Sequence, residues 1–380
     1  MKPGLPDAVR LRCSTNHRSL ISSTVPAWHA LRCLFYTGSL ALCVLLLNGC
    51  GVGYLWHVTM GQMSLLSRQQ PVDEVLQDAT LSDQKRQKIR LILEARTFAI
   101  EQLGMRASDS YTTFVQVDGP YVSYNLSAAP KDALQPYIWR FPIVGRVPYK
   151  GFFKKDKALR EQRALAALGY DTYVRGVRAY STLGYFDDPI ISSMLSLHDF
   201  ILVNTIIHEL LHQTVWIKGN VSFNESLANF IAEKGTIAYL AWRYGPISAE
   251  LQHYRDMRAD AAVFRAYMKA LVDRLQAMYQ QPLSVAEKLD HRERLFADAK
   301  HNYPTVFAKM KTTYYHRYFE RQTLNNAILL SFRRYNRHTT YFENLLADHE
   351  GDVRRLIAYF KSLSPDQLPE HFAESHAKSP

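Results

Sequence analysis

The sequence predicts an α+β fold in which a small antiparallel sheet is joined to a predominantly helical body. Three observations support this. Residues 50–104 carry apolar residues at helical spacing, residues 105–190 contain short runs rich in β-branched and aromatic residues, and nearly everything from Asp199 onward returns to the helical period of about 3.6 residues. The 380 residues, 47% of them hydrophobic, can bury one large core or two lobes.

The N-terminal segment, residues 50–104, is predicted to be helical from Met60 onward. Within Lys85–Leu103, small and aliphatic residues recur three or four positions apart, as on the buried face of a helix. These residues are Leu91, Ile92, Ala95 and Ala99.

The mixed region, residues 105–190, is predicted to hold the strands. Tyr111–Val117 and Tyr121–Tyr124 flank the dipeptide Asp118-Gly119, which favours a tight turn between two paired strands. Trp139–Val147 and Thr172–Tyr180 have the composition of further strands.

The helical body begins with residues 199–243 and continues through residues 249–363. Long amphipathic stretches at Ala249–Tyr279 and Ser284–Phe319 predict two long helices.

The stretch His208-Glu209-Leu-Leu-His212 is the main candidate for chemistry. On a helix, residues four apart lie one turn above each other, so both imidazoles project from one face and can bind a single zinc ion. Glu209 lies beside that face, where it can accept a proton from a water on the metal without being a ligand. The flanking residues are almost uncharged, and burying these polar groups is costly unless a metal or a partner satisfies them.

A catalytic zinc needs a third protein ligand. A break at Lys218-Gly219-Asn220 is predicted to end the first helix, Asn224 to cap the next, and Glu225 to occupy its first turn facing the histidines. Glu233, two turns further along, is the second choice as ligand. The alternative without a metal is a capped helix with a solvated acid and two core histidines.

At these motifs the chain resembles known proteins. His-Glu-x-x-His followed by Asn-Glu-x-x-Ala is similar to the gluzincin peptidases, although the interval from His212 to Glu225 is shorter here. Further segments resemble the bacterial predicted-aminopeptidase family of zinc-dependent lipoproteins, and the resemblance runs from about Cys50 to Leu363. They are Trp139–Phe153, Gly169–Tyr173, Ala179–Pro189, Phe223–Ser226 and Asn325–Ala327.

The resemblance implies a zincin-like arrangement and a zinc-dependent aminopeptidase activity. In zincins the edge strand beside the active-site helix pairs with an extended peptide, a role that would fall to Thr172–Tyr180, with Gly176 allowing close approach. An ordinary edge strand with a glycine bulge is the alternative.

Supporting residues can also be named from the sequence. Asn229, one turn after Glu225, is placed to bond a ligand histidine from behind. A phenol from Tyr180, Tyr185 or Tyr335 can stabilise the oxyanion of the reaction.

The N-terminus has the charge order of an export signal. Residues 34–56 carry no charge and follow a basic stretch that ends at Arg32. Leu47-Asn48-Gly49-Cys50 closes this run like a lipobox, which predicts a signal peptide over residues 1–49 and a lipid on Cys50. An uncleaved helix is the alternative, because about 23 apolar residues can span a bilayer.

Cysteine usage and charge agree with an exported, lipid-anchored protein. All four cysteines, Cys13, Cys33, Cys43 and Cys50, lie at or before the expected cleavage site, so disulfides play no part in the fold. The formal charge is +11, and its basic residues are scattered and join no nucleic-acid motif. This favours anionic lipid headgroups over nucleic acid as neighbours.

Two functions therefore stay open on sequence grounds. The first is a lipid-anchored zinc peptidase of the cell envelope, facing the periplasm and sorted to the outer membrane in a Gram-negative host. The second is a membrane-anchored binding or assembly protein with a structural zinc. Glu209 favours the first, because a structural site has four closed ligands and needs no base.

Overall fold

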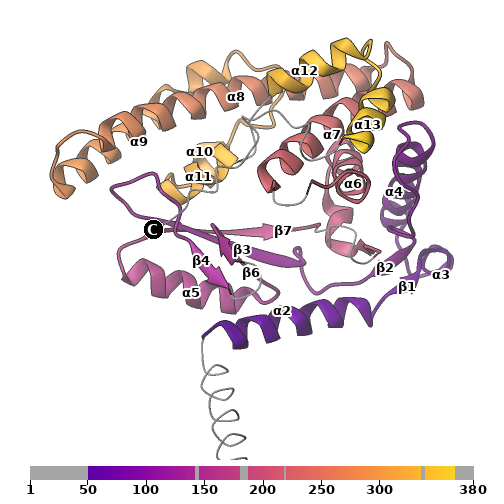
Figure 1. The fold of residues 1–380 in the computed structure, drawn as a ribbon, viewed down its shortest axis with the longest axis horizontal. Helices are drawn as coiled ribbons and strands as arrows, with labels where there is room; N and C mark the ends of the chain where they lie inside the picture. The colour runs from indigo at the N-terminus through magenta and orange to yellow at the C-terminus, as the bar shows by residue number, and fades with distance from the viewer. Residues whose placement is uncertain (1–49, 142–144, 180–186, 218–219, 335–338, 364–380) are drawn as a thin grey trace, which may run out of the picture. The chain divides into compact units, whose positions relative to one another are not determined.

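The computed structural model describes residues 50–141, 145–179, 187–217, 220–334 and 339–363. Clustering of contacts divides the chain into two units, Met1–Tyr54 and Leu55–Pro380. All the described sheets lie in the second unit, which is mostly helical, so the α+β prediction is confirmed (Figure 1). Among the described residues, no helix is both long enough and apolar enough to cross a membrane.

The N-terminal part contains three helices rather than one helical stretch. Helix α2 spans Cys50–Leu66, α3 spans Val72–Gln77 and α4 spans Asp83–Glu101, with the short strand β1 at Gln70–Pro71 before α3. The Ser82 side chain caps α4 by accepting a hydrogen bond from the Lys85 backbone N–H. The predicted apolar face of α4 is confirmed, since its four named residues are all buried.

The predicted hairpin around Asp118-Gly119 is wrong. Gly119 has a positive φ of 89°, as a tight turn requires, but the two flanking strands belong to different sheets. Strand β2, Thr113–Val115, pairs antiparallel with β1 and parallel with β8, Ile190–Ile191. Strand β3, Ser123–Ala129, pairs with β6 and β7 instead.

The sheet that matters for the site has the strand order β6-β3-β7, and both outer strands run antiparallel to β3. Strand β6 spans Lys150–Phe152 and β7 spans Asp171–Val177. Helix α5, Lys155–Ala167, and helix α11, Asn326–Arg334, pack against this sheet from opposite faces (Figure 1). Within the predicted strand segment Trp139–Val147, strands β4, Trp139–Phe141, and β5, Gly145–Val147, pair antiparallel as a separate two-stranded sheet.

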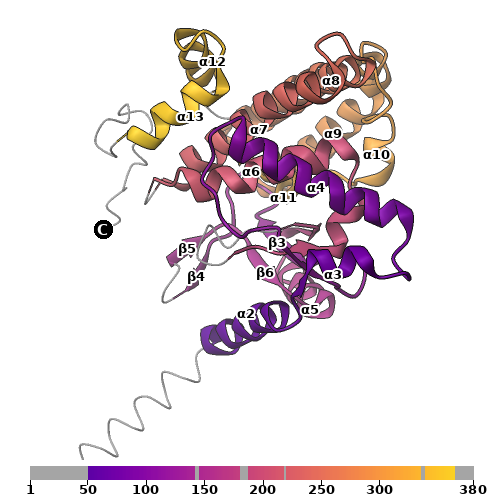
Figure 2. The same ribbon diagram turned by 90° about the vertical axis from the view of Figure 1, so that its right-hand side faces the viewer.

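The helical body is built around the hairpin of α6 and α7. Helix α4 packs against α6, while α8, α12 and α13 pack against α7, and α9 packs against α8 (Figure 2). The bounds of the helices not yet given are η1 Ser192–Ser196, α6 Asp199–Thr214, α7 Val221–Tyr244, α8 Ala249–Tyr279, α9 Val285–Phe307, α10 Tyr318–Arg321, α12 Thr339–Asp348 and α13 Val353–Ser362. The largest apolar core lies between α4, α6 and α7, so the candidate metal ligands sit on the most buried helices.

The second long helix ends twelve residues earlier than the prediction of Ser284–Phe319, at Phe307. The reason is a tertiary contact. The buried carboxylate of Asp260, on α8, accepts hydrogen bonds from the backbone N–H groups of Lys311 and Thr312 at 2.8 and 2.7 Å. These two groups are therefore satisfied outside a helix.

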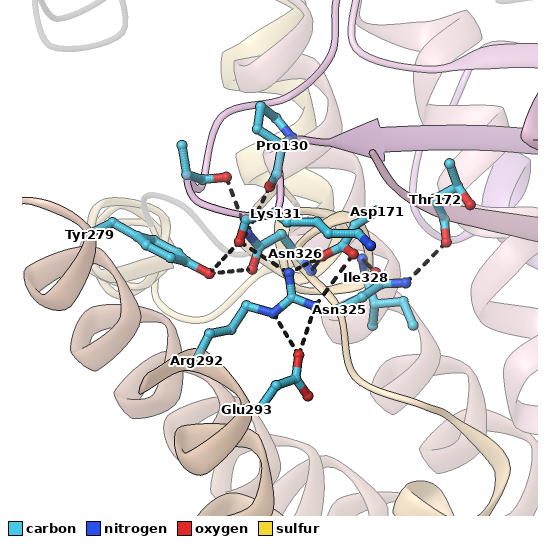
Figure 3. Close-up of polar contacts among 11 residues, drawn as sticks. Pro130, Lys131, Asp171, Thr172, Tyr279, Arg292, Glu293, Asn325, Asn326 and Ile328 are labelled. Atoms are coloured by element: carbon cyan, nitrogen blue, oxygen red, sulfur yellow. Dashed lines mark hydrogen bonds and ion pairs between the residues drawn. The ribbon is translucent and has the colours of Figure 1, made fainter. Parts of the chain in front are cut away.

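A buried polar hub joins the helical body to the β6-β3-β7 sheet (Figure 3). The Arg292 guanidinium, on α9, lies 3.1 Å from the Asp171 carboxylate at the start of β7 and donates to the Lys131 carbonyl at 3.0 Å. Asn326 donates its backbone N–H to Asp171, and its side-chain amide donates to the carbonyls of the loop after β3. Asn325 donates to the Thr172 carbonyl at 3.0 Å, which explains the paired asparagines in structural terms.

We predict that Arg292→Met destabilises the fold. The side chains of Arg292 and Asp171 are only 8% and 6% exposed, so the substitution leaves a buried carboxylate without its cation. The free energy of unfolding should fall by about 3 kcal/mol, as measured by urea denaturation.

The matched control is Arg294→Met on the same helix. Its partner Asp290 and Arg294 itself are 59% and 68% exposed, and such pairs contribute less than about 1 kcal/mol. Equal losses in the two variants would contradict a stabilising role for the hub.

Candidate metal centre and cleft

Helix α6 presents the two histidines of the motif on one face. The helix begins after His198, whose ring nitrogen accepts from the Phe200 backbone N–H, and ends at Thr214. His212 is 3% exposed, and the side chain of His208 is 15% exposed. Their rings meet edge to face with centroids 4.7 Å apart, and Trp216 packs against His212 from the other side.

Helix α7 begins earlier than the sequence predicts. Asn220, not Asn224, is the N-cap, and its side chain accepts from the Phe223 backbone N–H at 3.1 Å. Asn224 has a different role. Its buried amide donates to the Ile217 carbonyl at 2.8 Å and accepts from the Ile217 N–H at 2.9 Å. This clamp fixes the turn between α6 and α7 and places Glu225 in the second turn, still facing α6.

The side chains of His208, His212 and Glu225 converge. The two Nε2 atoms are 3.1 Å apart, and each lies 3.6 Å from an oxygen of the Glu225 carboxylate. Bonds of about 2.0–2.1 Å in a tetrahedral site would separate neighbouring ligand atoms by about 3.4 Å. The observed separations of 3.1 and 3.6 Å lie on either side of that value, so the three donors fit one metal ion. Among the described residues, they form the group of His, Cys, Asp or Glu side chains that could hold a metal ion.

The charges of the site suit such an ion. Burial and the neighbouring imidazole of His208 lower the pKa of His212 to about 4, so His212 is a neutral donor at physiological pH. Burial also acts to lower the pKa of His208. The hydrogen bond and charge of Glu225, the charge of Glu209 and a hydrogen bond with Asn229 outweigh it and raise that pKa. The carboxylates of Glu225 and Glu209 thus favour positive charge beside His208.

The other residues proposed from the sequence fall in different places. Asn229 is a hydrogen-bond partner of His208, and its buried Nδ2 has no partner among the described residues. Glu233 lies outside the metal-binding group and forms an ion pair with Arg258 of α8. Tyr180, Tyr185 and Tyr335 lie outside the described residues.

His208, one of the three candidate donors, lines a cleft of about 660 Å³ between α6 and the edge of β7. His208, Glu209 and Asn229 line it from the helices, and residues 173–177 of β7 with the two residues that follow line it from the opposite side. Strand β7 pairs with β3 on one side only, so it is an edge strand of the described sheet as predicted, although it ends at Val177 and not at Tyr180.

Gly176 has a role that neither interpretation from the sequence gave. The register between β3 and β7 is continuous from Ser123 to Ala129, so there is no bulge at Gly176. A Cβ at this position would lie 2.4 Å from the ring of Tyr121. The close approach that glycine permits is therefore made by the protein's own tyrosine, whose ring lies flat against the strand and also lines the cleft.

Sequence reasoning missed a buried network behind Glu209. Gln213, directly after His212, donates to the Asp188 carboxylate at 3.1 Å and to the Ser110 hydroxyl at 2.9 Å. Tyr111 donates its backbone N–H to the Asp188 carbonyl at 2.6 Å. Burial and the charges of Glu209 and Asp188 raise the pKa of the Tyr111 phenol. The phenol therefore stays protonated beside these two carboxylates. The only signal in the sequence was the position of Gln213 after a candidate ligand.

Residues 53–373 match the family described as "Putative aminopeptidase". No curated protein and no solved structure matches the chain.

Proposed function

Because this chain belongs to the family described as "Putative aminopeptidase", we propose that it is a zinc-dependent peptidase, an aminopeptidase in its cellular role. One observation carries the proposal. Glu209 lies directly after the candidate ligand His208 and lines the cleft beside it, but does not belong to the group His208, His212 and Glu225. Three ligands with an adjacent carboxylate in an open cleft are typical of catalytic zinc sites.

Each residue of the site has a separate role in the proposed hydrolysis. When held by the three donors, zinc supplies a Lewis acid that makes water more acidic and polarises a carbonyl group. Glu209 accepts the proton of the attacking water and returns it to the leaving amine. Asn229 orients the His208 imidazole, and the Asn224 clamp keeps Glu225 facing both histidines.

A peptide substrate would lie along β7 in a zincin-like arrangement. The free edge of this strand offers backbone donors and acceptors, and pairing with them holds an extended chain whatever its side chains. The five lining residues of β7, from Tyr173 to Val177, correspond to about 16 Å of strand, enough to pair with a peptide of about five residues.

The test combines metal analysis with an unbiased peptide library. The purified domain should contain one zinc ion per chain and cleave peptides, and chelation should abolish cleavage until zinc is restored. A tightly held zinc with no cleavage of any library member would instead favour the alternative, a binding or assembly protein with a structural zinc.

We also propose that Cys50 carries the lipid that anchors the protein in the cell envelope, with the catalytic unit facing the periplasm. The lipobox-like sequence Leu47–Cys50 after an uncharged run supports this, and the family match begins at residue 53, just beyond it. Mass spectrometry of the mature protein should find a diacylglyceryl group on an N-terminal Cys50. An unmodified Cys50 within an intact N-terminal peptide would refute lipoprotein processing.

A further inference from the structure

The cleft that contains Glu209 is lined mainly by neutral and cationic residues. Among its described lining residues, Glu209 is the single carboxylic acid, whereas two arginines, Arg175 and Arg178, belong to the lining. The charge of the cleft therefore suits an anionic group on the substrate.

Arg178 is held in a geometry suited to binding such a group. It directly follows β7, and its guanidinium lies over the Tyr121 ring, 4.8 Å from the ring centroid. Tyr121 in turn lies against Gly176, and Ser193 donates to the Arg178 carbonyl at 2.6 Å. Stacking on an aromatic ring fixes the plane of a guanidinium while its edge stays available for hydrogen bonds.

The Arg178 side chain has no carboxylate partner in the described part of the chain. Its Nε is buried and has no hydrogen-bond partner among the described residues. The neighbouring segment 180–186, Tyr-Ser-Thr-Leu-Gly-Tyr-Phe, contains neither Asp nor Glu. A buried donor with no partner is costly, and a bound anion would satisfy it.

We propose that Arg178, stacked on Tyr121, binds a carboxylate of the peptide substrate. This inference rests on the proposed peptidase function and specifies its substrate class: peptides with a carboxylate within a few residues of the cleaved bond. That carboxylate is either the side chain of Asp or Glu or the free C-terminus, and both match the two-pronged geometry of a guanidinium.

The experiment compares one uncharged peptide sequence in three forms, all with a free N-terminus. The first has an amidated C-terminus and the second a free C-terminus. The third is a set of amidated peptides in which a single Glu replaces each position in turn. For the full-length enzyme, kcat/KM should be about 10-fold higher for a carboxylate-bearing form than for the neutral amide. An advantage of the second form alone identifies the C-terminus, and an advantage of the third alone identifies an acidic side chain.

Arg178→Gln should reduce that preference to near unity. The matched control is Arg160→Gln on α5, which removes the same charge from an exposed position outside the cleft and should keep the preference. Should Arg178→Gln fail to fold, Arg178→Lys decides, because it keeps the charge but loses the stacked planar group and should still lower the preference. A wild-type enzyme without preference, or a preference unchanged in the Arg178 variants, overturns the proposal.

A binding measurement separates this proposal from the peptidase function itself. Fluorescence titration of the three peptides into Glu209→Gln, with and without Arg178→Gln, should show about 10-fold tighter binding of a carboxylate-bearing form only when Arg178 is present. Absence of cleavage by wild type together with this binding difference would refute the peptidase function alone. Cleavage without any binding difference would refute the role of Arg178 alone.

Discussion

Replacing Glu209 with glutamine is expected to reduce kcat for peptide hydrolysis by about 10²–10⁴-fold, the usual contribution of a positioned acid–base group. The substitution keeps the size of the side chain and its ability to form hydrogen bonds, but removes the proton acceptor from the cleft. Because Glu209 is outside the metal-binding group, zinc content and the thermal midpoint should stay close to those of wild type. Steady-state kinetics, elemental analysis and thermal denaturation measure the three quantities.

Glu250→Gln is the matched control for the Glu209 variant. It removes the same charge from an exposed position in the first turn of α8 and should leave kcat unchanged. If Glu209→Gln hydrolyses peptides as fast as wild type, the mechanism fails and the structural-zinc alternative takes its place. If it loses zinc as well as activity, Glu209 acts as a ligand and not as the base.

Glu225→Ala is expected to lose most of its zinc. The substitution removes one of three donors whose atoms all lie within 4.8 Å of one another, leaving only the two histidines. Loss of a supporting residue behind a ligand already weakens metal binding by about 10–100-fold, so removing a ligand should exceed that range. Titration with zinc in the presence of a competing chelator measures the affinity.

Glu233→Ala is the matched control, two turns further along the same helix. Glu233 is engaged with Arg258 and does not belong to the metal-binding group, so its variant should bind zinc as wild type does. Full zinc content in Glu225→Ala together with loss in Glu233→Ala would show that the third ligand is misassigned.

The elements that the sequence predicted well are those determined by local periodicity. Helix α8 begins and ends at the predicted residues, and the four apolar residues of α4 form a buried face as expected. His208 and His212 are neighbours on any helix, because four residues complete about one turn. Their convergence on one helix face could therefore be predicted without a partner element.

Elements that depend on distant partners were predicted less well. The turn at Asp118-Gly119 has the right residues for a hairpin, yet β2 pairs with β8, which lies more than 70 residues further along the chain. The end of α9 is determined by Asp260 of another helix. Local sequence contains no record of these contacts.

The sequence by itself predicted the candidate donors and the candidate base, because residue type and helical spacing are properties of a short segment. Only the tertiary structure distinguishes Glu225 from Glu233 as the candidate third ligand. The packing of α7 against α6 places Glu225 beside His212, whereas Glu233 forms an ion pair with Arg258. The tertiary structure also determines which side chains line the cleft. Tyr121, Gly176 and Arg178 come together because β3 and β7 pair in one register, and that register follows from burial over the whole sheet.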